Sequence, residues 1–352
     1  MKIINVVGAR PQFIKVKPIA DELNKRKIEH LLVHTGQHYD YEMSKVFFEG
    51  LQIHQPDYNL EVGSSSHGRQ TAEMLASLET LFVKEKPDVV IVYGDTNSTL
   101  SAALAASKMG IPIAHIEAGL RSYRKDMPEE INRVLTDHVS SLLFCPTETA
   151  VKNLYGENIN RGIHHVGDIM FDVFASEIDK PNNILQTLKI TEKDYYLLTM
   201  HRQENTKDTK KIEAVLNVLD RTGKPVVFPV HPRTGQLIKT IQDNYKNIKF
   251  IEPVGYSDMI NLEKNAIAVL TDSGGMQKEA YFAKVPCITL RKETEWVETL
   301  DGGWNRIVGT DPEKIRSAIE TNFNADIEQK NYFGDGQSAQ KTIDIILEEF
   351  SN

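Results

Sequence analysis

Three carboxylates lie along the chain at places where a parallel β-sheet commonly does chemistry. Asp95 comes just after the apolar run VVIVY, which predicts a buried strand, and Glu117 ends the next predicted strand. Glu129 follows Pro128 at the start of a predicted helix. Because ligands of open parallel sheets bind beyond the carboxyl ends of the strands, we expect Asp95 and Glu117 to share a crevice that Glu129 borders. Such carboxylates are candidates for acid–base chemistry on a bound ligand.

The same carboxylates have a structural alternative. They could cap helices or form ion pairs with arginines that follow closely in the sequence, namely Arg121, Arg124 and Arg133. The residue types alone leave both interpretations open.

A first candidate anion site lies near the N-terminus. Residues 2–7 predict a strand, Gly8-Ala9-Arg10-Pro11 a turn, and residues 13–25 have the apolar spacing of a helix. Backbone amides at the start of such a helix can bind a phosphate, and Arg10 and Lys15 would add positive charge. With a single glycine the turn is not a dinucleotide fingerprint, and a plain strand–helix corner with solvated cations remains the alternative.

A second candidate anion site lies at residues 271–275, between a predicted strand and a helix over 276–282. Its glycines would let a ligand approach the backbone closely, and a hydroxyl and helix amides could bind phosphate. One turn further on, Glu279 could accept hydrogen bonds from ribose hydroxyls, although a mere tight turn would also fit. The candidate ligand-binding residues of this site are Ser273, Gly274, Gly275 and Glu279.

Basic side chains follow two further predicted strands. His201 and Arg202 come after one, and His231 and Arg233 come after another. Four basic groups at neighbouring strand ends could bind a diphosphate, whereas a single histidine there is more often structural. Trp296 could be a stacking platform for a ligand or a core aromatic.

Strands and helices alternate in both halves of the chain. This pattern predicts an α/β protein with two doubly wound, Rossmann-like domains that face a cleft. We expect an N-terminal domain over residues 1–175 with the carboxylates and a C-terminal nucleotide-binding domain over 176–335. The polar, irregular stretch 179–193 should be the passage between them. A last helix within 336–352 should pack back on the first domain.

Composition narrows the function further. The 352 residues are 40% hydrophobic and 26% charged, as in soluble globular proteins, and no apolar run approaches the roughly 20 residues of a membrane span. The N-terminus has no signal-peptide pattern, so we expect a cytoplasmic protein. The net charge of −8 argues against nucleic-acid binding. Cys145 and Cys287, in apolar strands, should be reduced and buried, and we expect no metal.

The residues alone predict a two-domain enzyme that binds a nucleoside diphosphate in its cleft with carboxylates beside it. The chain moreover resembles the non-hydrolysing UDP-N-acetylglucosamine 2-epimerases from its first strand to its last helix. The matching segments, in order, are GARPQFIK, HTGQH, GDTNSTL, HIEAGLRS, PEEINR, HRQEN, HPRT, TDSGGMQKEA and YFGDGQSAQ.

The resemblance implies a fold, a reaction and a set of roles. The fold is that of the B-type glycosyltransferases and glycogen phosphorylase, usually as a homodimer, and the substrate is a UDP-activated amino sugar for cell-surface polysaccharides. The reaction inverts the sugar's C-2 carbon through a 2-acetamidoglucal without a cofactor. The implied diphosphate ligands are Arg10, Lys15 and His201, and the implied phosphate and ribose ligands are Ser273, Gly274, Gly275 and Glu279. The implied catalytic residues are Asp95, Glu117 and Glu129. From their places at strand ends, Arg202 and His231 are further candidate ligands, and His201 is a further candidate catalytic residue.

Departures from the family pattern leave the substrate open. Residues 294–298 read TEWVE where many members have TERPE, and this variant resembles the UDP-2,3-diacetamido-2,3-dideoxyglucuronate 2-epimerases. A C-6 carboxylate would want a cation, for which Arg121, Arg124 or Arg291 are candidates. Gln37 and His38 match an activating second nucleotide site, but Glu73 or Met74 replaces its arginine. A hydrolysing relative, a glycosyltransferase and a non-catalytic sugar-nucleotide sensor remain alternatives.

Overall fold

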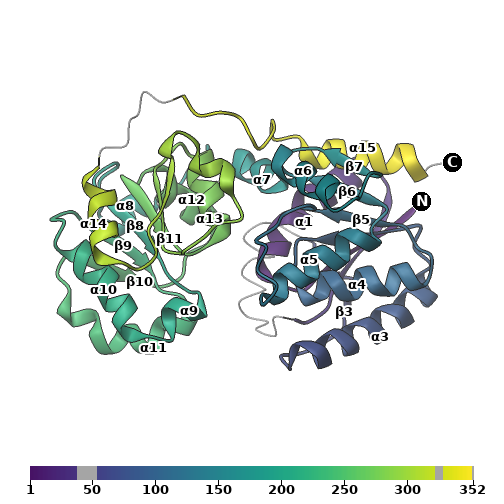
Figure 1. Cartoon of the computed structure of the whole chain (residues 1–352), viewed down its shortest axis with the longest axis horizontal. Helices are drawn as coiled ribbons and strands as arrows, with labels where there is room; N and C mark the ends of the chain where they lie inside the picture. The colour runs from purple at the N-terminus through teal and green to yellow at the C-terminus, as the bar shows by residue number, and fades with distance from the viewer. Residues whose placement is uncertain (38–53, 322–327, 351–352) are drawn as a thin grey trace. The chain divides into compact units, whose positions relative to one another are not determined.

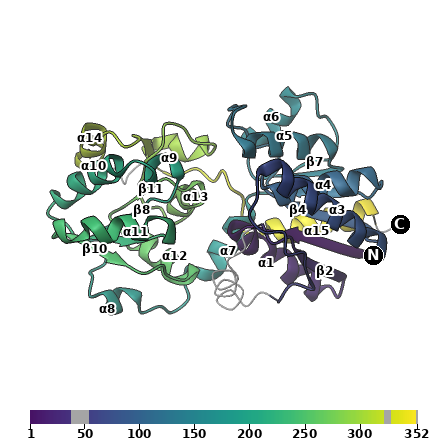
Figure 2. The same cartoon turned by 90° about the horizontal axis from the view of Figure 1, so that it is seen from below.

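The computed structural model of the chain describes residues 1–37, 54–321 and 328–350. It divides into two compact units, which we call unit 1 (Met1–Ala175 with Tyr332–Asn352) and unit 2 (Ser176–Asn331). In each unit a parallel sheet has helices on both faces (Figure 1, Figure 2). The predicted α/β class with two doubly wound sheets is therefore confirmed.

The described part of unit 1 contains a seven-stranded sheet in the order β3-β2-β1-β4-β5-β6-β7, and all neighbouring strands are parallel. The direction of winding reverses between β1 and β4, which is the position where open sheets leave a crevice for a ligand. The strands are β1 Lys2–Val7, β2 Glu29–His34, β3 Tyr58–Asn59, β4 Val89–Tyr93, β5 Ile113–Ile116, β6 Leu142–Cys145 and β7 Ile163–His165.

Helices cover both faces of this sheet. On one face, α3 and α4 bury apolar side chains such as Leu78 and Ala102 against Val6 and Val92 of the central strands. The C-terminal helix α15 packs against α1 (Figure 1). The helices of unit 1 are α1 Arg10–Lys25, α3 His67–Glu85, α4 Asn97–Lys108, α5 Pro128–Val139, α6 Glu148–Gly156, α7 Ile169–Glu177 and α15 Ser338–Phe350.

Local sequence explains the helix that follows the central strand. Thr96 caps α4, because its hydroxyl accepts a hydrogen bond from the Thr99 amide at 3.3 Å while the Thr99 hydroxyl accepts one from the Thr96 amide. The alanine-rich run then favours a helix packed closely on the sheet. Just beyond its end, Gly110 adopts a left-handed conformation with φ +70°. Thr96 and Gly110 thus set the bounds of α4 from residues that directly flank it.

Unit 2 has a six-stranded parallel sheet among its described residues, in the order β10-β9-β8-β11-β12-β13, so its winding reverses between β8 and β11. Successive residues point to opposite faces: Leu198 and Leu270 lie in the core under α10 and α14, and Leu197 and Val269 in the core under α12 and α13. The strands are β8 Tyr196–Thr199, β9 Val226–Pro229, β10 Ile248–Ile251, β11 Ala268–Thr271, β12 Cys287–Thr289 and β13 Asn305–Ile307. The helices are α8 Ile184–Leu188, α9 Gln203–Thr206, α10 Thr209–Asp220, α11 Pro232–Ile241, η1 Gln242–Asn244, α12 Tyr256–Lys264, α13 Gly274–Phe282, η2 Val297–Gly303 and α14 Pro312–Glu320.

The composition of the polar stretch 179–193 predicted an irregular passage between the two units. This prediction is wrong. It lies within unit 2 and contains the short helix α8, whose Ile184 is buried in the core. Asn182 accepts a hydrogen bond from the Ile184 amide and donates one to Asp258 of α12, both at 2.8 Å. The chain instead passes from unit 1 to unit 2 between Ala175 and Ser176, inside α7.

The C-terminal segment rejoins unit 1 through two close contacts. Gly167 and Gly334, with φ of +91° and +89°, approach so closely that a Cβ on Gly334 would lie 2.9 Å from the Gly167 Cα. The carboxylate of Asp172 then accepts hydrogen bonds from the amides of Ser338 and Ala339 at 3.0 and 2.8 Å, which caps α15. Burial raises the pKa of Asp172 to about 6 despite these two donors.

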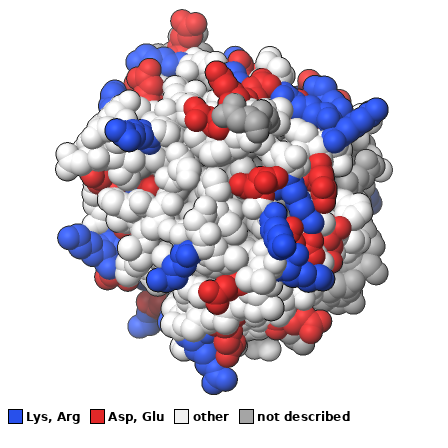
Figure 3. Space-filling model, turned by 90° about the vertical axis from the view of Figure 1, so that its right-hand side faces the viewer, with Lys and Arg blue, Asp and Glu red and all other residues white. Residues whose placement is uncertain are grey.

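The surface of unit 1 mixes both signs of charge. Figure 3 shows lysine and arginine beside aspartate and glutamate on one face of the molecule. Ion pairs on unit 1 include Lys2 with Glu85 at 2.7 Å and Arg26 with Asp344 at 2.5 Å. Over residues 1–37, 54–321 and 328–350, each helix is too short or too polar to cross a bilayer.

Candidate active site

The predicted residues of unit 1 gather where the winding of its sheet reverses. Asp95 follows β4, and α1 begins after β1. Arg10 is the first residue of α1 rather than part of the preceding turn, and its side chain lies outside the described residues. Lys15 lies further along the same helix and is buried.

Lys15 and Glu117 form a buried ion pair that joins α1 to the end of β5. Their side chains are 11% and 8% exposed. A Cβ on Gly94 would come within 3.1 Å of the Glu117 carboxylate and 3.4 Å of the Lys15 ammonium, so a glycine leaves room for the pair. Lys15 is thus in contact with a predicted catalytic carboxylate, and its role as a diphosphate ligand stays a prediction.

Asp95 is held by the helix that follows β5. Its carboxylate binds Arg133 of α5 at 2.5 Å, and the same guanidinium binds Glu130 at 2.8 Å. Glu130 also accepts hydrogen bonds from the amides of Ser122 and Tyr123. Burial alone would raise the pKa of Glu130, but these donors and Arg133 hold it below its ordinary value. Asp95 therefore has an arginine as its ion-pair partner, as the structural alternative predicted. Its side chain nevertheless remains 30% exposed.

Glu129 differs from the other two predicted catalytic carboxylates. It lies in the first turn of α5 and is exposed. Its carboxylate forms no hydrogen bond or ion pair with the residues that the structure describes. Its neighbour Glu130, which the sequence reasoning did not select, is the buried acid of this turn.

A pocket of about 410 Å³ lies in unit 1 among residues 67–72, 97 and 126–132. The first turns of α3, α4 and α5 surround it, so that backbone amides at three helix starts lie near its walls. Asn132, one of its lining residues, donates a hydrogen bond to the Asp95 carbonyl at 2.9 Å. The pocket has the size of small-molecule sites. Its lining residues are His67, Gly68, Thr71, Ala72, Asn97, Asp126, Pro128, Ile131 and Asn132.

In unit 2 the predicted basic residues surround a buried aspartate at the reversal between β8 and β11. Asp272 accepts hydrogen bonds from the amides of His201 and Arg202 and from the Asn205 amide group, each at 3.0 to 3.2 Å. The His201 ring is 3.2 Å from the same carboxylate and stacks on His231 with ring centroids 5.6 Å apart. Burial raises the pKa of Asp272, but its contacts with His201 and Asn205 outweigh burial and lower it.

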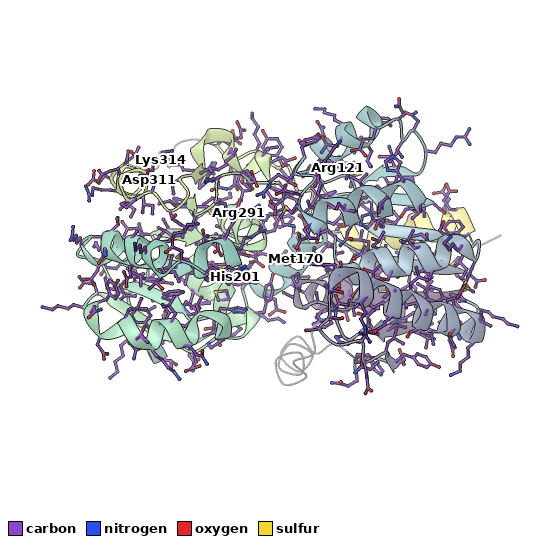
Figure 4. All side chains as sticks on the ribbon, turned by 60° about the horizontal axis from the view of Figure 1, so that its bottom comes forward. Arg121, Met170, His201, Arg291, Asp311 and Lys314 are labelled. Carbon is purple, nitrogen blue, oxygen red and sulfur yellow. The ribbon has the colours of Figure 1, made fainter. Side chains whose placement is uncertain are left out.

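Sequence reasoning missed Asp272 as an organiser of this site. The signal was its place in the DSGG turn, directly before the residues that we selected. The His201 and His231 rings lie together at neighbouring strand ends, and the backbone amide of Arg202 contacts the same aspartate, whereas the side chain of Arg233 lies outside the described residues. Figure 4 labels His201 in this unit.

The second predicted anion site is the start of α13. Ser273 is its N-cap, with its hydroxyl 3.5 Å from the Met276 amide. A Cβ on Gly274 would lie 2.5 Å from the Glu295 carboxylate, whereas one on Gly275 would meet nothing closer than 3.8 Å. Glu279, one turn on, is only 5% exposed.

Trp296 is a core residue and not an exposed stacking platform. It is 3% exposed, and the ammonium of buried Lys278 lies 3.8 Å from the centre of its ring. Next to it, Glu295 forms an ion pair with Arg291 at 2.8 Å, with both side chains nearly buried. Lys278 was not selected from the sequence, where it is simply one cation on a helix.

The arginines considered for a C-6 carboxylate are engaged in different ways. Arg121 is 1% exposed in its side chain and binds Asp137 at 2.7 Å and Glu157 at 2.6 Å. Arg291 is paired as described above, and exposed Arg124 binds Asp126 at 2.8 Å. Figure 4 labels Arg121 in unit 1 and Arg291 in unit 2.

Within the described residues, no group of three or more His, Cys, Asp or Glu side chains is placed to hold an ion. His34 and His38 are four positions apart in the sequence and could share a metal, but His38 lies outside the described residues. Both cysteines are free and buried, and burial raises the pKa of each thiol.

Comparisons with known proteins agree with this geometry. A family model described as UDP-N-acetylglucosamine 2-epimerase matches residues 21–347. A Methanococcus maripaludis protein named as a UDP-N-acetylglucosamine 2-epimerase homolog is 53% identical over 98% of this chain and 99% of its own. The UDP-2,3-diacetamido-2,3-dideoxy-D-glucuronate 2-epimerase of Pseudomonas aeruginosa is 43% identical, again over 98% and 99%.

Solved structures give the same result. The crystal structure of Methanocaldococcus jannaschii UDP-GlcNAc 2-epimerase in complex with UDP-GlcNAc and UDP has a TM-score of 0.90 and 44% identity, and the match covers 99% of this chain and 100% of that one. A Rickettsia africae glycosyltransferase has a TM-score of 0.61 at 15% identity, which is a likeness of fold alone. The chain belongs to the UDP-N-acetylglucosamine 2-epimerase family, whose members are isomerases.

Proposed function

We propose that the protein is a non-hydrolysing 2-epimerase of a UDP-2-acetamido sugar, of the UDP-GlcNAc to UDP-ManNAc type, that serves cell-surface polysaccharide synthesis. The observation that carries the proposal is the near-complete match, at a TM-score of 0.90, to an epimerase whose structure holds UDP-GlcNAc and UDP. The carboxylates at the ends of β4 and β5 and the anion site at the start of α13 supply the groups that this reaction needs.

The C-2 proton of the sugar is not next to a carbonyl, so direct deprotonation would be too costly. In the proposed route, the C-2 proton and the C-1 bond to UDP are lost together, and a C-1 to C-2 double bond forms. The product is a 2-acetamidoglucal and UDP. UDP then forms its bond to C-1 again. A proton adds to C-2 on the face opposite to the one from which the first proton left. The route is redox-neutral and calls for no redox cofactor.

Residues of unit 1 would handle the proton. Asp95 and Glu117 are fixed by Arg133 and Lys15, and a group that is already oriented loses little freedom when it reacts. Together with Glu129 they would take the C-2 proton, return one and stabilise the positive charge that develops on the sugar ring.

Residues of unit 2 would hold the departing UDP. The amides at the start of α13 and the Ser273 hydroxyl can bind a phosphate, and the Gly274 and Gly275 positions let it approach. Basic groups near the diphosphate would stabilise the charge that UDP gains as its bond to C-1 breaks. These groups are His201, Arg202 and His231, and the family resemblance adds Arg10 and Lys15. Glu279 would bind the ribose hydroxyls.

The test replaces each fixed carboxylate by its neutral isostere, in Asp95→Asn and Glu117→Gln. Proton NMR in deuterium oxide follows deuterium entry at C-2 and growth of the manno epimer, while calorimetry follows UDP binding. We expect UDP binding to persist and epimerisation to fall by about 10²- to 10⁴-fold. Asp88→Asn is the matched control, because exposed Asp88 precedes the same strand that Asp95 follows.

Near-normal turnover in both variants would refute the assigned roles. Loss of UDP binding in both would show instead that the carboxylates are structural. If the wild-type protein releases UDP and free N-acetylmannosamine without forming the manno epimer of the nucleotide sugar, the protein is a hydrolysing enzyme.

A second candidate substrate is UDP-2,3-diacetamido-2,3-dideoxyglucuronate, which the 43% identical Pseudomonas relative is named for. Its carboxylate would want a cation, and Arg121 is committed to Asp137 and Glu157 in the interior of unit 1. Arg291 is likewise paired with Glu295, whereas exposed Arg124 remains a candidate cation for this substrate. Parallel tubes with each nucleotide sugar distinguish the two, since deuterium enters C-2 of the true substrate. The expected homodimer stays a prediction that light scattering can test.

A further inference from the structure

The backbone that carries Asp95 is held in an unusual way. Three consecutive carbonyl oxygens at the end of β4 each accept a hydrogen bond from a side chain, and the three side chains come from different elements. The pairs are Gln12 Nε2 with the Tyr93 carbonyl at 2.7 Å, His115 Nε2 with the Gly94 carbonyl at 2.8 Å, and Asn132 Nδ2 with the Asp95 carbonyl at 2.9 Å.

All three donors are buried: Gln12 is 1%, His115 0% and Asn132 5% exposed. Gln12 belongs to α1, His115 to β5 and Asn132 to α5. Side chains that are packed into three separate elements cannot shift together without moving those elements. The three donors therefore hold the backbone of Gly94 and Asp95 more firmly than one contact would.

The hydrogen bonds of His115 define its protonation state. A carbonyl oxygen only accepts, so Nε2 must donate to the Gly94 carbonyl. Nδ1 lies 2.7 Å from one oxygen of Asp137, whose other oxygen accepts from the Gly119 amide at 3.1 Å and from Arg121 at 2.7 Å. Burial raises the pKa of Asp137, but its contacts with His115 and the Arg121 guanidinium outweigh burial and lower it. The carboxyl is therefore ionised and can only accept, so Nδ1 must donate as well. A histidine that donates from both nitrogens is an imidazolium.

The surroundings balance this charge. The side chains that face His115 and its partner are Asp137 and Arg121, and Arg121 also binds the carboxylate of Glu157. Burial and, to a smaller extent, the charge of nearby Asp137 raise the pKa of the Cys145 thiol. The thiol therefore adds no negative charge. Two cations and two anions thus form a neutral network in the interior of unit 1.

We infer that His115 is a buried imidazolium which, with Gln12 and Asn132, positions the turn formed by Gly94 and Asp95. It is a positioning residue, because it acts on the backbone of the turn and not on the substrate. The inference about its charge stands on contacts within unit 1, and only its effect on turnover rests on the proposed function.

The expected effect on catalysis follows from geometry. If the Gly94 carbonyl loses its donor, the turn can shift and the Asp95 carboxylate moves with it. Displacement of a reacting group by about 1 Å can cost on the order of 10²-fold in rate. UDP binding, which the proposed function gives chiefly to unit 2, should change little.

The first test needs no activity. Nitrogen-15 NMR of the full-length protein with labelled histidine reports whether each ring nitrogen carries a proton. We expect both nitrogens of His115, assigned by their absence in His115→Gln, to give signals of the protonated type at neutral pH. A signal that shows one unprotonated nitrogen at neutral pH would overturn the inference.

The second test compares two substitutions that each keep one half of the histidine. The amide of His115→Gln can reach the place of Nε2 and donate to the Gly94 carbonyl, whereas that of His115→Asn can reach only the place of Nδ1 and bind Asp137. We expect kcat to fall on the order of 10²-fold in the asparagine variant with KM little changed, and glutamine to restore most of it. His138→Asn, on the exposed end of α5, is the control.

The outcomes separate the two proposals. If the wild-type protein epimerises and the asparagine variant equals it, the positioning role is refuted while the proposed function stands. If the wild-type protein turns over neither sugar, the function fails, and the NMR result alone decides the charge of His115. Equal losses in both variants would mean that His115 supports folding and not the Gly94 carbonyl.

Discussion

A methyl group at Gly274 should destabilise unit 2, while the same change at Gly275 should not. The added Cβ at Gly274 would lie 2.5 Å from Oε1 of Glu295 and 3.3 Å from the indole nitrogen of Trp296. The added Cβ at Gly275 would lie 3.8 Å from Ser273 Oγ, its nearest neighbour, which is an ordinary contact. The two glycines are adjacent in α13, so they form a matched pair.

The magnitude follows from what must move. Glu295 cannot yield freely, because its other oxygen binds Arg291 at 2.8 Å and the side chains are 9% and 2% exposed. Breaking a buried pair by removing one partner costs about 3–5 kcal/mol, and forced overpacking costs about 1–3 kcal/mol. Since the pair would be displaced and not removed, we expect Gly274→Ala to lower the free energy of unfolding by about 2–3 kcal/mol. For Gly275→Ala we expect a change within about 1 kcal/mol.

Urea unfolding followed by tryptophan fluorescence is the assay. Both tryptophans of the chain, Trp296 and Trp304, lie in unit 2, so their emission follows that unit. A Glu295→Ala background removes the clashing oxygen, and there the Gly274→Ala change should cost much less. Equal unfolding free energies for the two alanine variants in the native background would refute the reasoning.

Two further predictions concern stability. Gly167→Ala should destabilise the packing of the C-terminal segment on unit 1 by at least about 2 kcal/mol, because φ is +91° and the new Cβ would lie 2.8 Å from the Phe333 carbonyl oxygen. Hydrogen exchange of the C-terminal segment measures this loss. Gly68→Ala is the control, because a Cβ there would meet no other atom within 4 Å. Glu263→Met should stabilise unit 2, since both carboxyl oxygens are buried without a hydrogen-bond partner among the described residues, and burial and Glu279 raise its pKa well above 4.5. The folded protein binds the proton of the Glu263 carboxyl more tightly than the unfolded chain does, so the wild type loses stability as pH rises above about 4.5. In urea unfolding, the stability advantage of the methionine variant should therefore grow from pH 5 to pH 8.

Local chemistry made some elements predictable. The bounds of α4 follow from a threonine cap and a glycine just past its end, and both signals are read within a few residues. The stretch 179–193 was misjudged because α8 is only five residues long, too short for a helical period to show above its polar neighbours. Burial of Ile184 depends on strands that lie far away in the sequence.

Pairing between distant residues was less accessible. Lys15 and Glu117 are 102 positions apart, and the sequence suggested arginines as the partners of the carboxylates and gave no reason to join these two. Arg121 was among those candidates, but it is bound by Asp137 from the inward face of α5. Helical geometry places neighbouring side chains about 100° apart, which buries one acid of the Glu129–Glu130 pair and exposes the other.

The three predicted catalytic carboxylates differ in whether an ion pair holds them in place. Asp95 and Glu117 are each tied to a cation on another element, and the carbonyl contacts of Gln12, His115 and Asn132 fix the backbone beneath Asp95. Glu129 lies exposed in the first turn of a helix, where the positive end of the helix dipole favours its charge without fixing its rotamer. An elimination and re-addition at C-2 needs groups whose position does not change between the two half-reactions, together with one group that can follow the sugar as its ring flattens and is rebuilt. Within the proposed mechanism, Asp95 and Glu117 would have the first property and Glu129 the second.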